Sequence, residues 1–201
     1  MAELAHLNWG GRDLTGEVHA GDTLVDVDLS EVVGSGASFT DCVLRDCSLN
    51  AAVLVSWAFT GCTFTGCSLF DTRLVGCKLV GSTFARCRFD LLSAEGGDWS
   101  FTGLASADLR RTSLTDVRMR EADLRKARLQ EVTWHGVDLS GSDLTGADLS
   151  GADLRGSDLS SLDPRTTVVA GAVVDLQQAL TVARALGLDV RGDEGPPARA
   201  G

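Results

Sequence analysis

A large apolar residue recurs at every fifth position from Leu4 to Leu159, and the count does not slip. These positions, called centres below, hold Leu, Phe, Trp or Met almost throughout, as in the run Leu44, Leu49, Leu54, Phe59 and Phe64. Neither an α-helix, with 3.6 residues per turn, nor a β-strand, with a side-chain period of two, produces a strict period of five. An internal repeat this regular indicates a solenoid, in which short repeats stack on one another.

A second position, two residues before each centre, is mostly small. This position, called the small slot below, holds Ala, Cys, Ser or Thr in most repeats, as at Cys42, Ala52 and Thr72. Glycine is frequent two residues after the centre, where its conformational freedom suits a turn. Each repeat therefore predicts one large and one small inward side chain, followed by a turn.

The repeat resembles that of the pentapeptide-repeat family, often written A(D/N)LXX, and its purest form here runs from Ser142 to Gly156. The resemblance implies an all-β fold, a right-handed quadrilateral parallel β-helix in which four pentapeptides make one square coil. Residues 20 apart would then stack, with Phe39 under Phe59 and Phe64 under Phe84. About eight coils at the ~4.8 Å spacing of β-ladders would form a rod of ~38 Å, and its terminal coils would need caps.

Three places depart from the pattern. Gly34 leaves a hole at a centre, and Trp57 is oversized for a small slot, so we expect its ring to be pushed partly outward. In the segment 91–99, Leu92 occupies a small slot and Ala94 a centre. We favour a local repacking of that segment, with a bulge that shapes a partner surface as the alternative.

Composition limits the class of protein. The 201 residues are 44% apolar, enough for one sizeable core. No apolar run of 18 residues and no secretory-type N-terminal segment is present, so we expect a cytoplasmic protein without a membrane partner. The net charge of −10 argues against direct nucleic-acid binding through a basic patch.

The chemistry-bearing residues follow the repeat. Six cysteines invite a metal or disulfide interpretation, but every one occupies a small slot, where Cys replaces Ala, Ser or Thr as a small buried residue; they are Cys42, Cys47, Cys62, Cys67, Cys77 and Cys87. The three histidines lack ligand spacing, and no nucleophile or phosphate-loop motif is present. We therefore expect no enzyme activity, no metal and no cofactor.

The repeat ends near Asp163-Pro164, which predicts a β-helix over residues 1–163, a C-terminal module over 164–190 and a disordered tail over 191–201. Asp175 and Gln178 have the spacing of a capping box, and apolar residues then recur with helical spacing up to Leu186 before Gly187. Leu188-Asp189-Val190 could be a short strand. The helix could cap the last coil, form a dimer, or do both; the predicted dimerisation residues are Val168, Val169, Val173, Val174, Leu176, Leu180, Ala183 and Leu188.

This C-terminal pattern resembles that of topoisomerase-protecting family members, the MfpA and Qnr type associated with quinolone or albicidin resistance. The resemblance implies a homodimer joined through the C-terminal module. It also implies a non-catalytic rod that mimics DNA, binds DNA gyrase and protects it from gyrase-targeting antibiotics. The competing hypothesis is a structural or scaffolding rod with another protein partner.

Duplex DNA carries one charge per ~1.7 Å, or about 22 over ~38 Å, whereas the net charge of this chain is −10. Mimicry of DNA would therefore depend on local acidic patches. The first patch is an acidic collar of Asp138, Asp143, Asp148, Asp153 and Asp158. The second is an N-terminal acidic group of Asp22, Asp26, Asp28 and Glu31. Between them lies a basic belt of Arg110, Arg111, Arg118, Arg120, Arg125, Lys126 and Arg128. The collar aspartates either contact gyrase or satisfy turn backbone groups, and the belt could pair with Asp108, Glu121 and Asp123.

Overall fold

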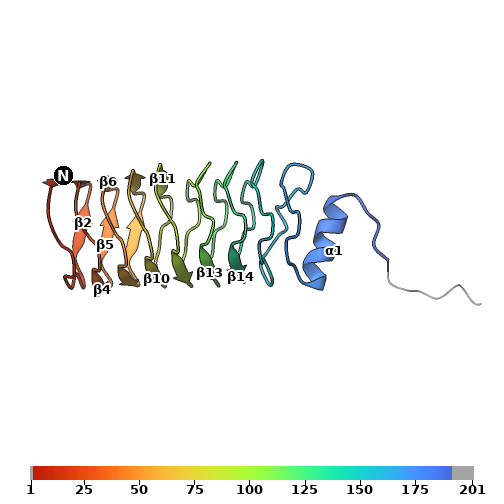
Figure 1. The fold of residues 1–201 in the computed structure, drawn as a ribbon, viewed down its shortest axis with the longest axis horizontal. Coiled ribbons are helices and arrows are strands. Elements are labelled where there is room, and N and C mark those ends of the chain that lie inside the picture. Colours follow the sequence, from red (N-terminus) through yellow and green to blue (C-terminus); the bar gives the residue numbers. More distant parts are fainter. Residues whose placement is uncertain (1, 192–201) are drawn as a thin grey trace, which may run out of the picture.

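The computed structural model describes residues 2–191 and shows a parallel β-solenoid, a rod with one helix at its C-terminal end (Figure 1). Three of its four sides carry sheets of three-residue strands. The first sheet has the order β1 (Glu3–Ala5), β3 (Thr23–Val25), β6 (Val43–Arg45), β9 (Thr63–Thr65), β11 (Thr83–Ala85). The second has the order β14 (Thr133–His135), β13 (Ser113–Thr115), β12 (Ser93–Glu95), β10 (Arg73–Val75), β7 (Val53–Val55), β4 (Val33–Ser35). The third has the order β2 (Val18–Ala20), β5 (Ser38–Thr40), β8 (Ala58–Thr60).

Every strand pairs with a strand 20 residues away, so four pentapeptides make one turn. Pairings run from Leu4 opposite Leu24 to Leu114 opposite Trp134, all parallel. The fourth side, around the centres 9, 29 and 49, is joined by isolated parallel bridges such as Asn8 to Asp28. The predicted β-helical fold with 20-residue coils is therefore confirmed.

The centres fill the interior with stacked side chains of the same kind. Phe39 lies opposite Phe59, with ring centroids 5.0 Å apart, and Phe64 lies opposite Phe84 at 4.6 Å. Both predicted stacks are confirmed. Because stacking places like beside like, the core forms one continuous column along the rod.

The small slots do more than leave room for the centres. Side chains there donate hydrogen bonds to carbonyl oxygens 23 residues earlier, in the preceding turn: Ser82 Oγ to Phe59 O at 2.8 Å, and Thr72 Oγ1 to Leu49 O at 2.8 Å. Cys62 Sγ makes the same contact with Phe39 O at 3.3 Å. In these slots Cys, Ser and Thr each supply a donor to the preceding turn, whereas Thr102 and Thr112 donate to carbonyl oxygens of their own turn.

Five of the six cysteines are buried, and all six are free thiols. Burial raises the pKa of the Cys62 thiol to about 12 and also raises that of Cys77, because a thiolate is poorly solvated in the core. These contacts support the structural interpretation of the buried cysteines.

Two of the irregular places compensate each other. Trp57 is buried, contrary to the expectation of a ring pushed outward. Its Nε1 donates to Gly34 O at 3.0 Å, and its ring stacks on Phe39 at 5.8 Å. The indole of Trp57 in the neighbouring small slot therefore compensates for the missing side chain at the Gly34 centre.

The segment 91–99 shows the expected repacking. Leu92 is buried in its small slot, and Ala94 is buried at its centre. The exterior over Ala94 is hollowed, with a cavity of about 270 Å³ lined by Ser93, Glu95 and neighbours on adjacent strands. The size inversion therefore produces a dent, and the alternative of a bulge is wrong.

The solenoid extends beyond the predicted boundary at residue 163. Bridges join Asp148 to Val168 and Asp153 to Val173, and Thr167 Oγ1 donates to Leu144 O as a small slot should. The five-residue count continues with valine at the centres 169 and 174. The predicted boundary lies too early in the chain, because these valines are smaller than the residues that mark earlier centres.

The helix α1 (Leu176–Ala185) begins at the predicted capping box, with Asp175 accepting from the Gln178 backbone and the Gln178 side chain accepting from the Asp175 N–H. It ends before Gly187, whose φ is +88°. The predicted strand at Leu188–Val190 is absent, because Leu188 N donates to Ala183 O to close the helix and no strand within residues 2–191 pairs with this segment. The tail predicted over 191–201 lies, apart from Arg191, outside the described residues.

Candidate partner-binding surfaces

Each aspartate of the acidic collar closes its own turn. In all five, Oδ1 accepts a hydrogen bond from the backbone N–H two residues later, at distances such as 2.9 Å for Asp143 with Thr145 and 2.8 Å for Asp158 with Ser160. This is the Asx-turn arrangement. The backbone role proposed for these aspartates is therefore present, and any partner contact would use the remaining oxygen lone pairs.

Hydrogen bonds to the carboxylates favour the ionised form of Asp143, Asp148 and Asp153. Hydrogen bonds from the Thr145 hydroxyl and backbone hold the pKa of Asp143 below its usual range, and those from Ser150 do the same for Asp148. The Arg155 side chain is the main cause of the lowered pKa of Asp153. A donor to the carboxylate favours its charged form.

The solenoid does not bring the five collar residues onto one face. Consecutive members lie on consecutive sides, so only Asp138 and Asp158 are bridge neighbours. Ion pairs further divide the set: Asp138 binds Arg120, and Asp153 binds Arg155 at 2.7 Å. Asp148 and Asp158 form no ion pair among residues 2–191, and Asp143 has Arg125 at 3.8 Å.

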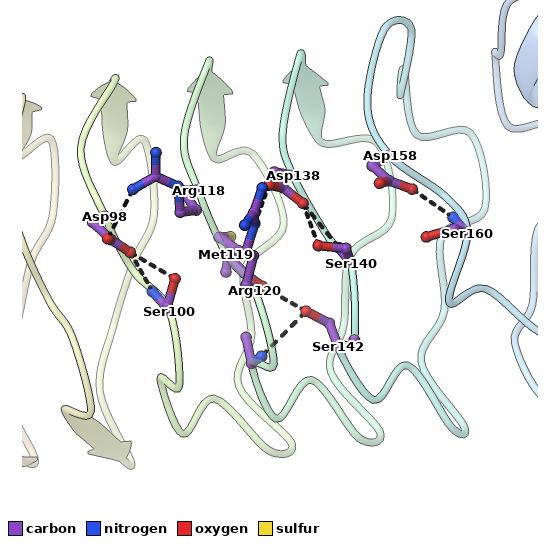
Figure 2. A network of polar contacts seen from close by, with 12 residues as sticks. Asp98, Ser100, Arg118, Met119, Arg120, Asp138, Ser140, Ser142, Asp158 and Ser160 are labelled. Atoms are coloured by element: carbon purple, nitrogen blue, oxygen red, sulfur yellow. Dashed lines mark hydrogen bonds and ion pairs between the residues drawn. The ribbon is translucent and has the colours of Figure 1, made fainter.

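The basic belt is largely paired with nearby acids. Arg118 donates to Asp98 at 3.0 Å, and Arg120 donates to Asp138. Figure 2 shows these residues on adjacent turns, beside Ser142, which donates from its small slot to Met119 O. Asp108 and Asp123 are confirmed as belt partners through Arg110 and Arg125. Glu121, which was expected to join them, forms no ion pair within the described part of the chain.

The N-terminal acidic group lies within half a turn, over residues 22–31, and two of its members contact residues of the preceding turn. Asp22 accepts from Ala2 N and from His19 at 3.2 Å, Asp26 contacts His6 at 2.9 Å, and Asp28 closes a turn with Ser30. Glu31 is exposed at a corner. These four residues span ten positions, half of a 20-residue turn, so they cover two adjacent sides and their corners, whereas the collar runs through a whole turn.

Charge is segregated along the axis more than around it. Residues 2–72 carry ten acidic and two basic side chains, residues 73–128 carry seven and eleven, and residues 129–163 carry seven and one. The rod thus has two acidic ends and a basic centre. A partner that recognises the whole length must follow that order of charge.

The C-terminal end carries an apolar groove. Its volume is about 320 Å³, and it lies between the last turn and α1, lined by Leu154, Leu159, Leu162, Val169, Ala172, Val174, Ala179, Val182, Ala183, Leu186 and Leu188. Of the predicted dimerisation residues, Val169, Val174, Ala183 and Leu188 line this groove. Val168, Val173 and Leu176 are exposed outside it, and Leu180 is half-buried without lining it.

A residue that the sequence identifies only as part of the capping box also holds the helix in place. The Gln178 side chain is buried, and its Nε2 donates to Leu154 O at 2.6 Å and to Ser157 O at 2.7 Å. These carbonyls belong to the last full turn. Gln178 therefore pins the first turn of α1 against the solenoid, while the later turns of α1 border the groove.

Among residues 2–191, no group of three or more His, Cys, Asp or Glu side chains is arranged to hold a metal ion. Within the same residues, no helix is long and apolar enough to span a bilayer.

Comparison with known proteins agrees with the repeat. The family model "Pentapeptide repeats" matches eight copies over residues 104–133 and 122–160. A trypsin-treated form of QnrB1, a plasmid-mediated fluoroquinolone resistance protein, matches at a TM-score of 0.67 and 23% identity, over 94% of this chain and 99% of that one. A second trypsin-treated form matches at a TM-score of 0.58 and 22% identity, over 95% and 100%. No curated protein matches the chain. The matched repeats over residues 104–160, and the 20-residue ladders that continue the same register through the rest of the solenoid, show that the chain is built from pentapeptide repeats.

Proposed function

We propose that this protein is a non-catalytic rod that binds DNA gyrase, competes with DNA for the enzyme, and protects it from gyrase-targeting antibiotics. The likeness to QnrB1, a fluoroquinolone resistance protein, covers nearly the full length of both chains. At 23% identity that likeness establishes the fold alone, so the gyrase role depends on surface features of this chain.

The surface feature that carries the proposal is the pair of acidic ends. Residues 129–163 carry seven acidic side chains and one basic side chain. Hydrogen bonds within the turns lower the pKa of collar carboxylates such as Asp143 and Asp148 and so favour their charged form. A DNA-binding enzyme presents a basic surface to the phosphate backbone. A rigid rod with charged carboxylates at fixed positions is complementary to such a surface.

A supercoiling assay tests the proposal directly. Purified gyrase supercoils a relaxed plasmid in the presence of increasing amounts of this protein, with and without a fluoroquinolone, and both supercoiling and DNA cleavage are measured. We expect less supercoiling by gyrase alone at high protein, and less drug-induced DNA cleavage at lower protein. If neither activity changes at a large molar excess, gyrase is not the partner and the alternative of a scaffolding rod stands.

We further propose that two copies join through the C-terminal groove. A helix that served only as a cap would cover the last turn, whereas here the groove stays open and apolar side chains on both of its walls reach solvent. Exposed apolar patches of this kind mark association surfaces. A second copy fits because a two-fold axis would place each helix in the groove of the other.

The substitution Leu186→Asp is expected to convert the dimer to a monomer. Leu186 lines the groove and is 53% exposed, so a carboxylate there is tolerated in the single chain but would be buried without a partner in the dimer. Light scattering gives the molar mass. The matched control is Val18→Asp, because Val18 is 72% exposed at the opposite end of the rod. A Leu186→Asp protein that keeps the mass of a dimer would exclude the groove as the interface.

A further inference from the structure

The backbone ladder of the fourth side is interrupted between two turns near the middle of the rod. One turn earlier, Leu69 N donates to Arg88 O at 2.8 Å, and the same bond is made one turn later at 2.9 Å. Between them, Phe89 N and Asp108 N form no hydrogen bond within the described part of the chain. The acceptors that the register places opposite them, Asp108 O and Cys87 O, accept none there either. The two turns therefore face each other across a gap with unpaired backbone donors and acceptors.

A hollow on the outside of the rod lies at this gap. It has a volume of about 430 Å³ and is lined by residues of both turns, among them Arg86, Phe89 and Asp108. The second turn contributes only short side chains at residues 105–107 (Ala, Ser and Ala), so they leave the gap uncovered. Because the ladders before and after the gap are in register, Phe89 N and Asp108 N point into it. The hollow thus gives access to the unpaired backbone groups.

Positive charge gathers on this side of the rod. In the three turns around the gap, the fourth side and its corners comprise residues 85–91, 105–111 and 125–131, which carry seven basic and three acidic side chains. The other sides of the same turns, residues 92–104 and 112–124, carry two basic and five acidic side chains. The basic centre of the rod is therefore concentrated on one side, around the gap.

Three of these cations are available to a partner. Arg86, Arg111 and Lys126 are exposed, and none of them forms an ion pair among residues 2–191. They lie at corners, two along one edge of the fourth side and one along the other, so they flank the gap. Asp108, the carboxylate at the hollow, is already bound by two arginines, at 2.7 Å and 3.1 Å. The surface around the gap is therefore cationic.

We propose that this gap is the docking site of an extended acidic segment of a partner protein. A peptide backbone supplies both N–H donors and carbonyl acceptors, which the unpaired groups of the two turns require. Its Asp or Glu side chains would meet the flanking cations. The site is separate from the acidic ends of the rod, so it goes beyond the proposed gyrase role.

A nucleic acid fits this surface less well than a peptide. Its phosphate backbone carries acceptors but no N–H donor for Cys87 O or Asp108 O. The three basic turns also extend only ~10 Å along the axis, at the spacing of a β-ladder. On either side of them lie the acidic ends of the rod, which would repel a long polyanion. A short acidic peptide meets neither obstacle.

Fluorescence anisotropy on the full-length protein tests the proposal. The probe is a fluorescein-labelled octapeptide of alternating glutamate and leucine. A labelled thymidine pentanucleotide, whose phosphates equal the glutamates in number, tests the competing class. We expect the peptide to bind saturably, and the pentanucleotide to bind at least ~10-fold more weakly. Absence of peptide binding would overturn the proposal, and a pentanucleotide that binds as tightly would overturn the choice of partner.

Variants matched in charge locate the docking site. The first combines three substitutions of the flanking cations: Arg86→Gln, Arg111→Gln and Lys126→Gln. The control combines three substitutions of paired arginines on other sides: Arg118→Gln, Arg120→Gln and Arg155→Gln. We expect the Kd of the octapeptide to rise at least ~10-fold in the first and less than ~2-fold in the control, whose charges are more distant from the gap. Equal effects of the two variants would overturn the placement.

Amide hydrogen exchange reports the backbone contact, which attraction between charges alone would not produce. In isotope-labelled wild-type protein, we expect the N–H groups of Phe89 and Asp108 to exchange at least ~10-fold faster than that of Leu69, whose hydrogen bond is intact. Saturation with the octapeptide should slow both. Unchanged exchange at Phe89 and Asp108 in the saturated complex would show that the peptide does not pair with the gap, and would overturn the proposal.

Discussion

The substitution Gly97→Ala is expected to destabilise the rod by more than about 4 kcal/mol, a range that few single changes reach. Gly97 occupies the small slot before the large centre Trp99, with φ at +96°. A Cβ there would lie 2.1 Å from Cys77 O and 2.9 Å from Cys77 N. Both are backbone atoms of the preceding turn, and Cys77 O accepts from Asp98 N, so neither can move without opening the ladder.

The neighbouring Gly96→Ala is the matched control. Gly96 has a φ of +63° at a corner, with nothing within 4 Å of the added Cβ, so only the left-handed conformation opposes the change, at about 1–2 kcal/mol. Urea unfolding followed by circular dichroism measures both variants. Equal losses at the two positions would show that the close approach of Gly97 to Cys77 is not what the slot requires.

The substitution Phe59→Ala should cost about 3–5 kcal/mol, as expected for removing a buried aromatic ring from a packed core. The ring stacks on Phe39 at 5.0 Å and meets Phe64 edge to face at 5.3 Å. Its loss leaves a void in the middle of a column whose neighbours are fixed by ladders on every side. Collapse around the void is therefore limited.

Phe101→Ala serves as the control for Phe59→Ala, because it removes the same side chain from a corner where Phe101 is 55% exposed. We expect a change within about 0.5 kcal/mol there, measured by the same urea titrations. A loss at Phe59 as small as that at Phe101 would contradict the continuous core described above.

The repeat determines most of the fold because a five-residue period leaves one way to stack. It predicted the pairing of Phe39 with Phe59 and the burial of five of the six cysteines. The prediction from the repeat failed at positions where the size of the side chain no longer distinguishes a centre from a small slot. Val169 and Val174 continue the solenoid with smaller centres, and Trp57 fills space left by Gly34, a contact between turns that no local pattern displays.

The candidate surfaces were less predictable than the fold. Capping-box spacing located Gln178, but its bonds to Leu154 and Ser157 depend on where the last turn leaves carbonyls open. Likewise, the collar aspartates recur at every fifth position of the sequence but lie on four different sides, because one turn of the solenoid takes 20 residues. Its pairing with belt arginines such as Arg120 spans 18 residues and requires the coil geometry.

The most direct test of the central claim is displacement of DNA from gyrase by variants matched in charge. In the first variant, Asp143, Asp148 and Asp158 become Asn, which preserves the turn acceptors and removes charge from the collar. In the second, Asp98, Asp108 and Asp123 become Asn, which removes equal charge from turns that already pair with arginine. A fluorescently labelled duplex bound to gyrase reports displacement. The account predicts that the wild type and the second variant displace the duplex at similar concentrations, whereas the first requires at least ~10-fold more. Equal displacement by both variants, or none by the wild type, would contradict it.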